Sequence, residues 1–199
     1  MVNYVQVRNP ERTRQRILRA ALGEFAAKGY AGARVDGIAA RAKVNKRLLY
    51  HYFGNKDQLF REVMRHKVAE KTETVIAAPN DALDLLPYWY RVVCDDPEWL
   101  RLVQWEALQP LENLVEEESR RREFGEALDK LRVGQREGSV TSHLGAEELL
   151  LAMLALTTYP QSFPQMARLI TGLAHDSEEF RERWATCLRF LGRLLREHG

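Results

Sequence analysis

The segment VNKRLLYHYF, residues 44–53, combines basic and apolar side chains at helical spacing. Asn45 is a good N-cap for a short helix over residues 46–53, because its side-chain oxygen can accept a backbone N–H of the first turn. A second short helix is expected at residues 35–42, just before a tight turn. Two short helices in this order are typical of a helix-turn-helix, whose second helix enters the DNA major groove.

Helical spacing continues on both sides of this segment, and no strand pattern is found. Ile17, Ala21 and Phe25 recur every four residues and form one apolar face. Pro10 suits the first turn of their helix, and Gly29 suits its end. The fold class expected is therefore all-α. The predicted helices cover about residues 10–28, 35–42, 46–53, 56–76, 82–94, 97–108, 111–136, 146–159, 162–172 and 177–197.

The charge is divided unevenly along the 199 residues. Residues 1–56 hold twelve Lys and Arg against three acids, a net charge of +9, and the remaining residues carry a net charge of −7. A basic module on an acidic body indicates a polyanionic partner for the module alone. We predict a DNA-binding domain at residues 1–56 and a helical effector-binding and dimerisation domain at residues 57–199.

Several classes of protein are disfavoured by the composition. The chain has no apolar run of the roughly 18 residues that a membrane span requires, and Met1–Arg16 lacks the apolar core of a signal peptide. Cys94 and Cys187 are far apart, which suits a reducing cytoplasm. We find no phosphate loop, no nucleophile motif and no clustered metal ligands. We therefore expect a cytoplasmic protein that is not an enzyme, without a cofactor, metal or membrane contact.

The first 60 residues resemble the TetR family of transcriptional regulators. The resemblance rests on Arg16-Ile17-Leu18 with Ala20-Ala21, on Phe25 with Gly29-Tyr30, on Ile38-Ala39 with Ala42 and Val44, and on Leu49-Tyr50-His51-Tyr52-Phe53-Gly54-Asn55-Lys56. It implies a homodimer that binds double-stranded DNA, with a connecting helix that leads to a helical domain for a small effector. In this chain the connecting helix is expected at residues 56–76.

Base readout is assigned to the outer face of the second short helix. Arg47 can bind guanine through two parallel hydrogen bonds, and Lys46 can bind either a base or a phosphate. His51 lies four residues after Arg47, on the same face, and is expected at a base or a thymine methyl. Leu48 either contacts a thymine methyl or packs inside the domain.

Phosphate contacts are assigned partly by the resemblance. It places Tyr50, Tyr52 and Lys56 at the DNA backbone, although either tyrosine ring can instead serve only packing. Lys56 also opens a helix, where the backbone N–H groups favour an anion. Arg34 precedes the first short helix and is a further phosphate ligand.

The turn between the two short helices departs from the family pattern. Lys43 stands where the family usually has glycine, so a positive φ there costs about 1 kcal/mol. Lys43 therefore either strains the turn or gains a phosphate contact in return. Ala33-Arg34 replace the hydroxyl residues often found before the first short helix, and Gly37 should weaken that helix.

Two late helices carry apolar stripes that suit either a dimer or a monomer core. Two such helices from each chain can form a four-helix bundle across a two-fold axis. The interface residues predicted on this basis are Met153, Trp184, Leu188 and Leu191.

Aromatic side chains are frequent in the acidic body, and they either line a ligand pocket or fill an ordinary core. The predicted pocket residues are Trp89, Tyr90, Trp105, Tyr159 and Phe163.

These observations favour a dimeric regulator, expected to be a repressor that binds a palindromic operator and is released by a small-molecule effector. The alternative is an architectural or partner-recruiting DNA-binding protein with the same reading head and no effector. Ligand-induced release from DNA distinguishes the two.

Overall fold

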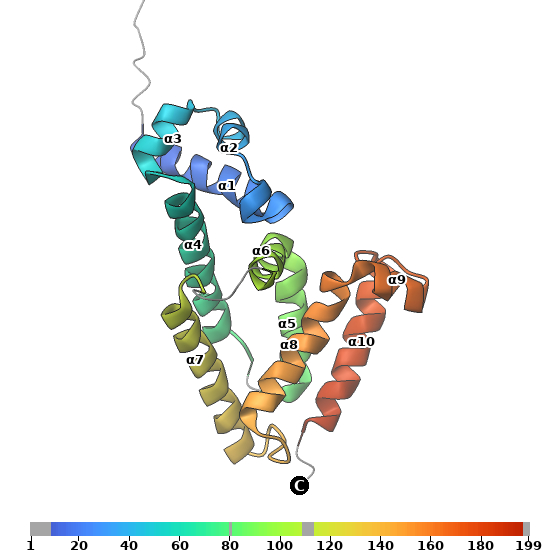
Figure 1. Cartoon of the computed structure of the whole chain (residues 1–199). Helices are drawn as coiled ribbons and strands as arrows, with labels where there is room; N and C mark the ends of the chain where they lie inside the picture. The colour runs from blue at the N-terminus through green and yellow to red at the C-terminus, as the bar shows by residue number, and fades with distance from the viewer. Residues whose placement is uncertain (1–8, 80, 109–113, 197–199) are drawn as a thin grey trace, which may run out of the picture. The chain divides into compact units, whose positions relative to one another are not determined.

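Helices are the only regular elements in the described part of the chain. The computed structural model describes residues 9–79, 81–108 and 114–196, and these ranges contain no strand (Figure 1). The prediction of an all-α fold is confirmed. The helices are α1 (Pro10–Gly32), α2 (Val35–Arg41), α3 (Lys46–Phe53), α4 (Lys56–Ile76), α5 (Ala82–Asp95), α6 (Pro97–Ala107), α7 (Glu117–Arg136), α8 (Ala146–Ser162), α9 (Pro164–Thr171) and α10 (Glu178–Leu194).

Side-chain caps explain where several helices begin. The Oδ1 atom of Asn9 accepts the N–H of Arg12 at the start of α1, and that of Asn45 accepts the N–H of Leu48 at 2.7 Å at the start of α3. Asn55 caps α4 by accepting the N–H of Gln58 at 2.8 Å. Each contact satisfies a backbone donor that the first helical turn leaves without a partner.

The predicted helices are all found, but the bounds of most of them differ from the structure by one to a few residues. The regular part of α1 is interrupted at Gly29, where φ is 68° and ψ is 174°, although helical turns resume as far as Gly32. Helix α8 continues past its predicted end to Ser162 with Pro160 inside it. The helix predicted over residues 111–136 begins only at Glu117, since residues 115 and 116 form a turn, and the helix predicted to end at residue 197 ends at Leu194. Residues 111 and 197 themselves lie outside the described residues.

The chain forms two compact units, and the division falls within α4 and α6. The first unit comprises residues 1–67 and 101–116, and the second comprises residues 68–100 and 117–199. The predicted boundary at residues 56 and 57 coincides with the start of α4. The first unit therefore extends further along α4 than predicted and also takes in part of α6.

The first unit has a core with contributions from α1, α2, α3 and the first part of α4. Helix α2 packs against both α1 and α3. The fully or almost fully buried side chains of this core include Ile17, Leu18, Ala21, Phe25, Ile38, Leu49, Leu59, Val63 and Met64.

The second unit is organised around α5, which packs against both α8 and α10. Its core is a single apolar cluster with contributions from α5, α7, α8 and α10. The buried members are Ala78, Leu85, Leu86, Tyr90, Leu131, Val140, Ala146, Leu149, Met153 and Leu188.

Candidate nucleic-acid interface and ligand cavity

Helix α3 has one face in the core and one face in solvent. Leu49 and Phe53 are buried, whereas Arg47 and His51 are exposed. Leu48 is half-buried, which is compatible with either contact to a thymine methyl or packing inside the domain. The burial of one face fixes the rotation of the helix about its axis. The other face therefore presents a fixed set of polar side chains.

Lys46 and Arg47 differ in their surroundings. The Lys46 ammonium lies 3.0 Å from a carboxylate oxygen of Asp36 on α2, and its hydrogen bond to Asp36 raises the pKa of Lys46. Arg47 makes no hydrogen bond or ion pair with any residue in the described ranges. Its five N–H donors are therefore available for planar recognition of a base or a phosphate.

Tyr50 and Tyr52, two predicted phosphate ligands, flank this face. Tyr50 is exposed, and Tyr52 is half-buried with its ring edge-on to that of His51 at 5.8 Å. The ring of Tyr52 also lies beside that of Phe53, with the two centroids 6.3 Å apart. The Tyr52 ring thus has a packing role, and this does not exclude a phosphate contact through its hydroxyl.

The three predicted basic phosphate ligands lie around the two short helices. Lys56 stands 4.8 Å from the ring centroid of Tyr30, and its Nζ donates to the carbonyl of Ala31. Arg34 is exposed at the start of α2. Lys43 is exposed and has φ of 52°, which confirms the positive φ considered for this turn.

A buried carboxylate beneath α2 was missed by the sequence analysis. The side chain of Glu24 is 2% exposed, and it accepts hydrogen bonds from Lys28 Nζ at 2.7 Å and from the N–H of Arg34. Arg41 completes the group at 3.6 Å. The hydrogen bond from Lys28 is the main reason that the pKa of Glu24 is lowered.

Gly37 explains why α2 can approach this carboxylate. A β-carbon at Gly37 would lie 3.2 Å from Glu24 Oε1, which is tighter than most contacts of a β-carbon in proteins and would require the Glu24 side chain to shift. The sequence held a signal for this contact, because Glu24 falls on the apolar stripe of α1, three residues after Ala21 and seven after Ile17. Gly37 therefore has a packing role next to Glu24 in addition to its weak helix propensity.

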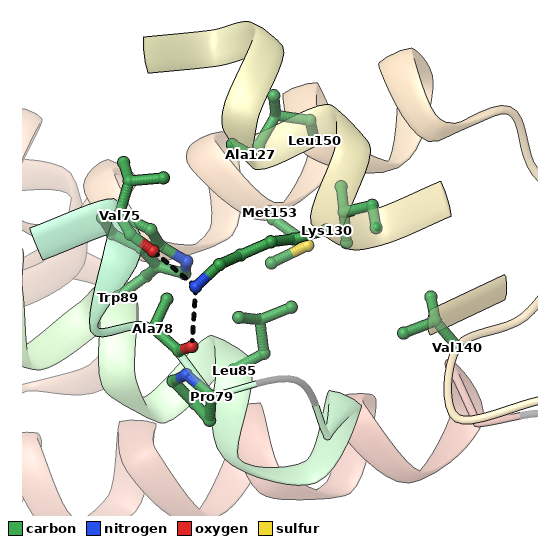
Figure 2. Close-up of a pocket in the computed structure, with 11 residues that line it drawn as sticks. Val75, Ala78, Pro79, Leu85, Trp89, Ala127, Lys130, Val140, Leu150 and Met153 are labelled. Carbon is green, nitrogen blue, oxygen red and sulfur yellow. Dashed lines mark hydrogen bonds between the residues drawn. The ribbon is translucent and has the colours of Figure 1, made fainter. Parts of the chain in front are cut away.

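Two adjoining hollows lie within the second unit. They have volumes of about 20 Å³ and about 50 Å³ and share the lining residues Val75, Trp89, Ala127, Leu150 and Met153. Most of the lining is apolar. Lys130 lines the smaller hollow (Figure 2), and Glu123 lines the larger one.

The predicted pocket residues are distributed over several places. Trp89 lines both hollows. Tyr90 is buried in the core instead, and this burial raises the pKa of its hydroxyl. Tyr159 and Phe163 are exposed and pack against each other with ring centroids 5.1 Å apart. Trp105 belongs to the first unit, where its Nε1 donates to the carbonyl of Ala26.

Both units match known families along most of their length. Residues 17–63 match the family of bacterial regulatory proteins named tetR, and residues 84–189 match the tetracyclin repressor-like C-terminal domain. The chain belongs to the TetR family. It is thus a DNA-binding transcriptional regulator with a helix-turn-helix, as the resemblance implied.

Relatives of this TetR-family regulator are found among both sequences and structures. The HTH-type transcriptional repressor SCO4008 of Streptomyces coelicolor is 36% identical over 83% of this chain and 86% of its own length. NicS, an HTH-type transcriptional repressor of Pseudomonas putida, is 32% identical over 64% of each chain. The solved structure of the transcriptional regulator SCO4942 from Streptomyces coelicolor is similar with a TM-score of 0.75 and 27% identity, over 90% of this chain and 97% of that one.

The predicted interface residues of this TetR-family regulator lie largely inside its second unit. Met153 and Leu188 belong to the buried core, and Trp184 and Leu191 pack against it. Their side chains meet those of the same chain, because the apolar stripes of α8 and α10 are turned toward α5. The exposed apolar side chains of these helices are different residues, among them Leu151, Phe190 and Leu194.

No group of three or more His, Cys, Asp or Glu among the described residues is placed to hold a metal ion. No helix within the described ranges is long and apolar enough to span a bilayer.

Proposed function

We propose that this TetR-family regulator is a repressor that binds a palindromic operator as a dimer and is released by a small molecule held in the second unit. The observation that carries the proposal is that the Arg47 guanidinium is exposed and makes no hydrogen bond or ion pair with the described residues. Arg47 lies on a helix whose opposite face is anchored by Leu49 and Phe53. An anchored helix with an available guanidinium suits direct reading of a base pair.

The other residues of the first unit divide by role. Lys46 reads a base or a phosphate after it leaves Asp36, and His51 and Leu48 contact bases beside Arg47. Arg34, Lys43, Tyr50, Tyr52 and Lys56 hold phosphates and set the register of the helix. These contacts cluster because the turn between α2 and α3 and the start of α4 flank the recognition helix.

Dimerisation is proposed through exposed apolar side chains of α8 and α10. Leu151 is 68% exposed, and Phe190 and Leu194 are each 59% exposed. Large apolar side chains in solvent are a feature of protein–protein interfaces. A second copy related by two-fold symmetry would cover the same residues on both chains. We expect Phe190→Glu to shift the protein to monomers in sedimentation, while the substitution Arg122→Glu at an exposed position of α7 does not.

The first experiment is binding of the purified protein to the DNA upstream of its own gene, titrated with salt and competitor DNA. We expect a competitor-resistant complex with a two-fold footprint. Arg47→Ala should weaken it by roughly 1–3 kcal/mol per contact. Arg136→Ala, which removes an exposed arginine from α7, should leave binding unchanged. Retention of specific binding by both Arg47→Ala and Lys46→Ala would overturn the assigned readout.

The same protein–DNA complex can be used to test whether a small-molecule effector releases the protein from DNA. A small molecule that binds the second unit and releases the DNA supports the regulator with an effector. An architectural protein with the same reading head predicts no release by any ligand. Action on chromosomal DNA also implies that the protein works in the cytoplasm, and the proposed activity requires no catalytic step.

A further inference from the structure

Lys130 on α7 caps the C-terminal end of α4. Its Nζ donates to the carbonyl oxygens of Val75 at 2.8 Å, Ile76 at 2.7 Å and Ala78 at 3.2 Å. Figure 2 shows the ammonium between the end of α4 and the segment that follows it. A lysine ammonium has three N–H donors, so these carbonyls occupy all of them.

This contact matters because the last carbonyls of a helix lack partners within the helix and carry the negative end of its dipole. At the end of α4, Ala77 and Ala78 still donate backward to Glu73 and Val75, but the carbonyls beyond need a donor from elsewhere. Lys130 supplies it from another helix. The end of α4 is therefore held by a side chain that also borders a cavity.

The same lysine is the charged residue among those that line the smaller hollow. Its lining companions include Leu85, Trp89 and Met153, which are apolar or aromatic. The hollows, at about 20 Å³ and about 50 Å³, hold little more than water molecules, each of which needs roughly 10–15 Å³. A larger ligand can enter only if part of the wall moves.

The charges around the hollows favour a negative group on that ligand. Lys130 makes no ion pair with a carboxylate in the described ranges, and neutral carbonyls compensate its charge only in part. Glu123 lies at the larger hollow, where burial raises its pKa and the charges of Arg120 and Lys71 act against this rise. Glu123 thus already has cations nearby, whereas the Lys130 ammonium has no carboxylate partner among the residues that the structure describes.

We infer that Lys130 is a latch on the connecting helix α4, opened by an apolar molecule that carries a carboxylate. The apolar part occupies the joined hollows beside Trp89, and the carboxylate draws the ammonium away from the carbonyls of Val75, Ile76 and Ala78. The carbonyls that Lys130 leaves are neutral dipoles, whereas the carboxylate carries a full negative charge and therefore attracts the ammonium more strongly at the same distance. Loss of the cap loosens the end of α4. This inference rests on the proposed function, because it names the ligand class and the trigger of the same site.

The ligand class is tested with three probes that share one apolar chain: octanoate, octanol and octylammonium. Binding is followed by thermal unfolding and by the fluorescence of the protein without DNA. We expect wild-type protein to bind octanoate at least about tenfold more tightly than the other two probes. Lys130→Met should lose this preference, and Lys130→Arg should keep most of it. Equal binding of the three probes, preferential binding of octylammonium, or no binding of octanoate would overturn the assignment.

The latch is tested without any ligand by hydrogen–deuterium exchange. In Lys130→Met the amides of residues 72–78 should exchange several-fold faster than in wild type, while α10 is unchanged. Octanoate should accelerate the same segment in wild type. Unchanged exchange at 72–78 in Lys130→Met would contradict the latch. Neither test uses DNA, so a failure of operator binding would remove the proposed function without removing these results.

Discussion

The indole of Trp105 lies against Gly29, so closely that a β-carbon at residue 29 would stand 2.8 Å from Trp105 Cδ2. Gly29 has φ of 68° and ψ of 174°, a backbone region that is essentially restricted to glycine. The indole N–H also donates to the carbonyl of Ala26 at 3.2 Å. One side chain of α6 thus holds the last part of α1 within the first unit.

Replacement of Gly29 by alanine should destabilise the protein through two effects. The backbone strain costs about 1–3 kcal/mol, and the clash with the Trp105 ring costs a further ~1–3 kcal/mol. Two other glycines separate these effects. Gly172 has φ of 74° with open space around it, and Gly125 on α7 has open space and no positive φ.

Urea denaturation of the three Gly→Ala variants measures the difference. The free energy of unfolding should fall most for Gly29→Ala and less for Gly172→Ala. For Gly125→Ala it should rise by up to about 1 kcal/mol, because alanine favours a helix. Equal losses at residues 29 and 172 would show that the Trp105 contact is not tight.

Replacement of Glu24 by glutamine should destabilise the first unit at neutral pH by about 1–3 kcal/mol, because charge-assisted hydrogen bonds are lost in a buried place. The pKa of Glu24 is lowered in the folded protein, mainly by the hydrogen bond from Lys28. Its stabilisation is therefore complete above the ordinary glutamate pKa of about 4.3 and disappears as the pH falls through the lower folded value.

Unfolding curves measured from pH 7 to pH 3 test this dependence of the Glu24 stabilisation on pH. Wild type should lose its advantage over Glu24→Gln only in the acid range. Glu182→Gln, at an exposed position of α10, should change the stability by less than about 0.5 kcal/mol. A constant difference between wild type and Glu24→Gln at all pH values would mean that the carboxylate charge contributes nothing.

Replacement of Lys43 by glycine should stabilise the fold and weaken DNA binding. Lys43 has φ of 52°, so glycine relieves strain of about 1 kcal/mol. The lysine charge is lost in the same step, and the dependence of binding on salt should decrease by about one phosphate contact. Lys43→Ala is the matched control, since it removes the charge and keeps the strain. If Lys43→Gly retains the full salt dependence, the lysine does not contact phosphate.

Replacement of Asp36 by asparagine should strengthen DNA binding. Asp36 holds the Lys46 ammonium at 3.0 Å, and its charge opposes the approach of phosphates to α3. Removal of the carboxylate frees Lys46 and should raise the affinity, with a steeper salt dependence. The control is Asp129→Asn, which breaks a comparable exposed pair with Arg132 in the second unit. Weaker binding by Asp36→Asn would indicate that the aspartate positions Lys46 for readout.

Most of the fold followed from local patterns in the sequence. The helix starts at Asn45 and Lys56, the break at Gly29 and the positive φ at Lys43 all depend on residues within one or two turns of each other. The exposed side of α3, with Arg47 and His51, was predictable for the same reason. Once a helix and its buried side are known, helical spacing places every other side chain of that helix.

The tertiary structure alone revealed the contacts between residues far apart in the chain. Three such contacts join helices whose sequence patterns are independent of each other. Trp105 packs on Gly29, Gly37 packs on Glu24, and Lys130 caps the end of α4. The apolar stripes that hold Met153 and Leu188 suited either a dimer surface or a monomer core, and both side chains lie in the core. An apolar stripe shows that a helix face is covered, but only the packing of the whole chain shows which surface covers it.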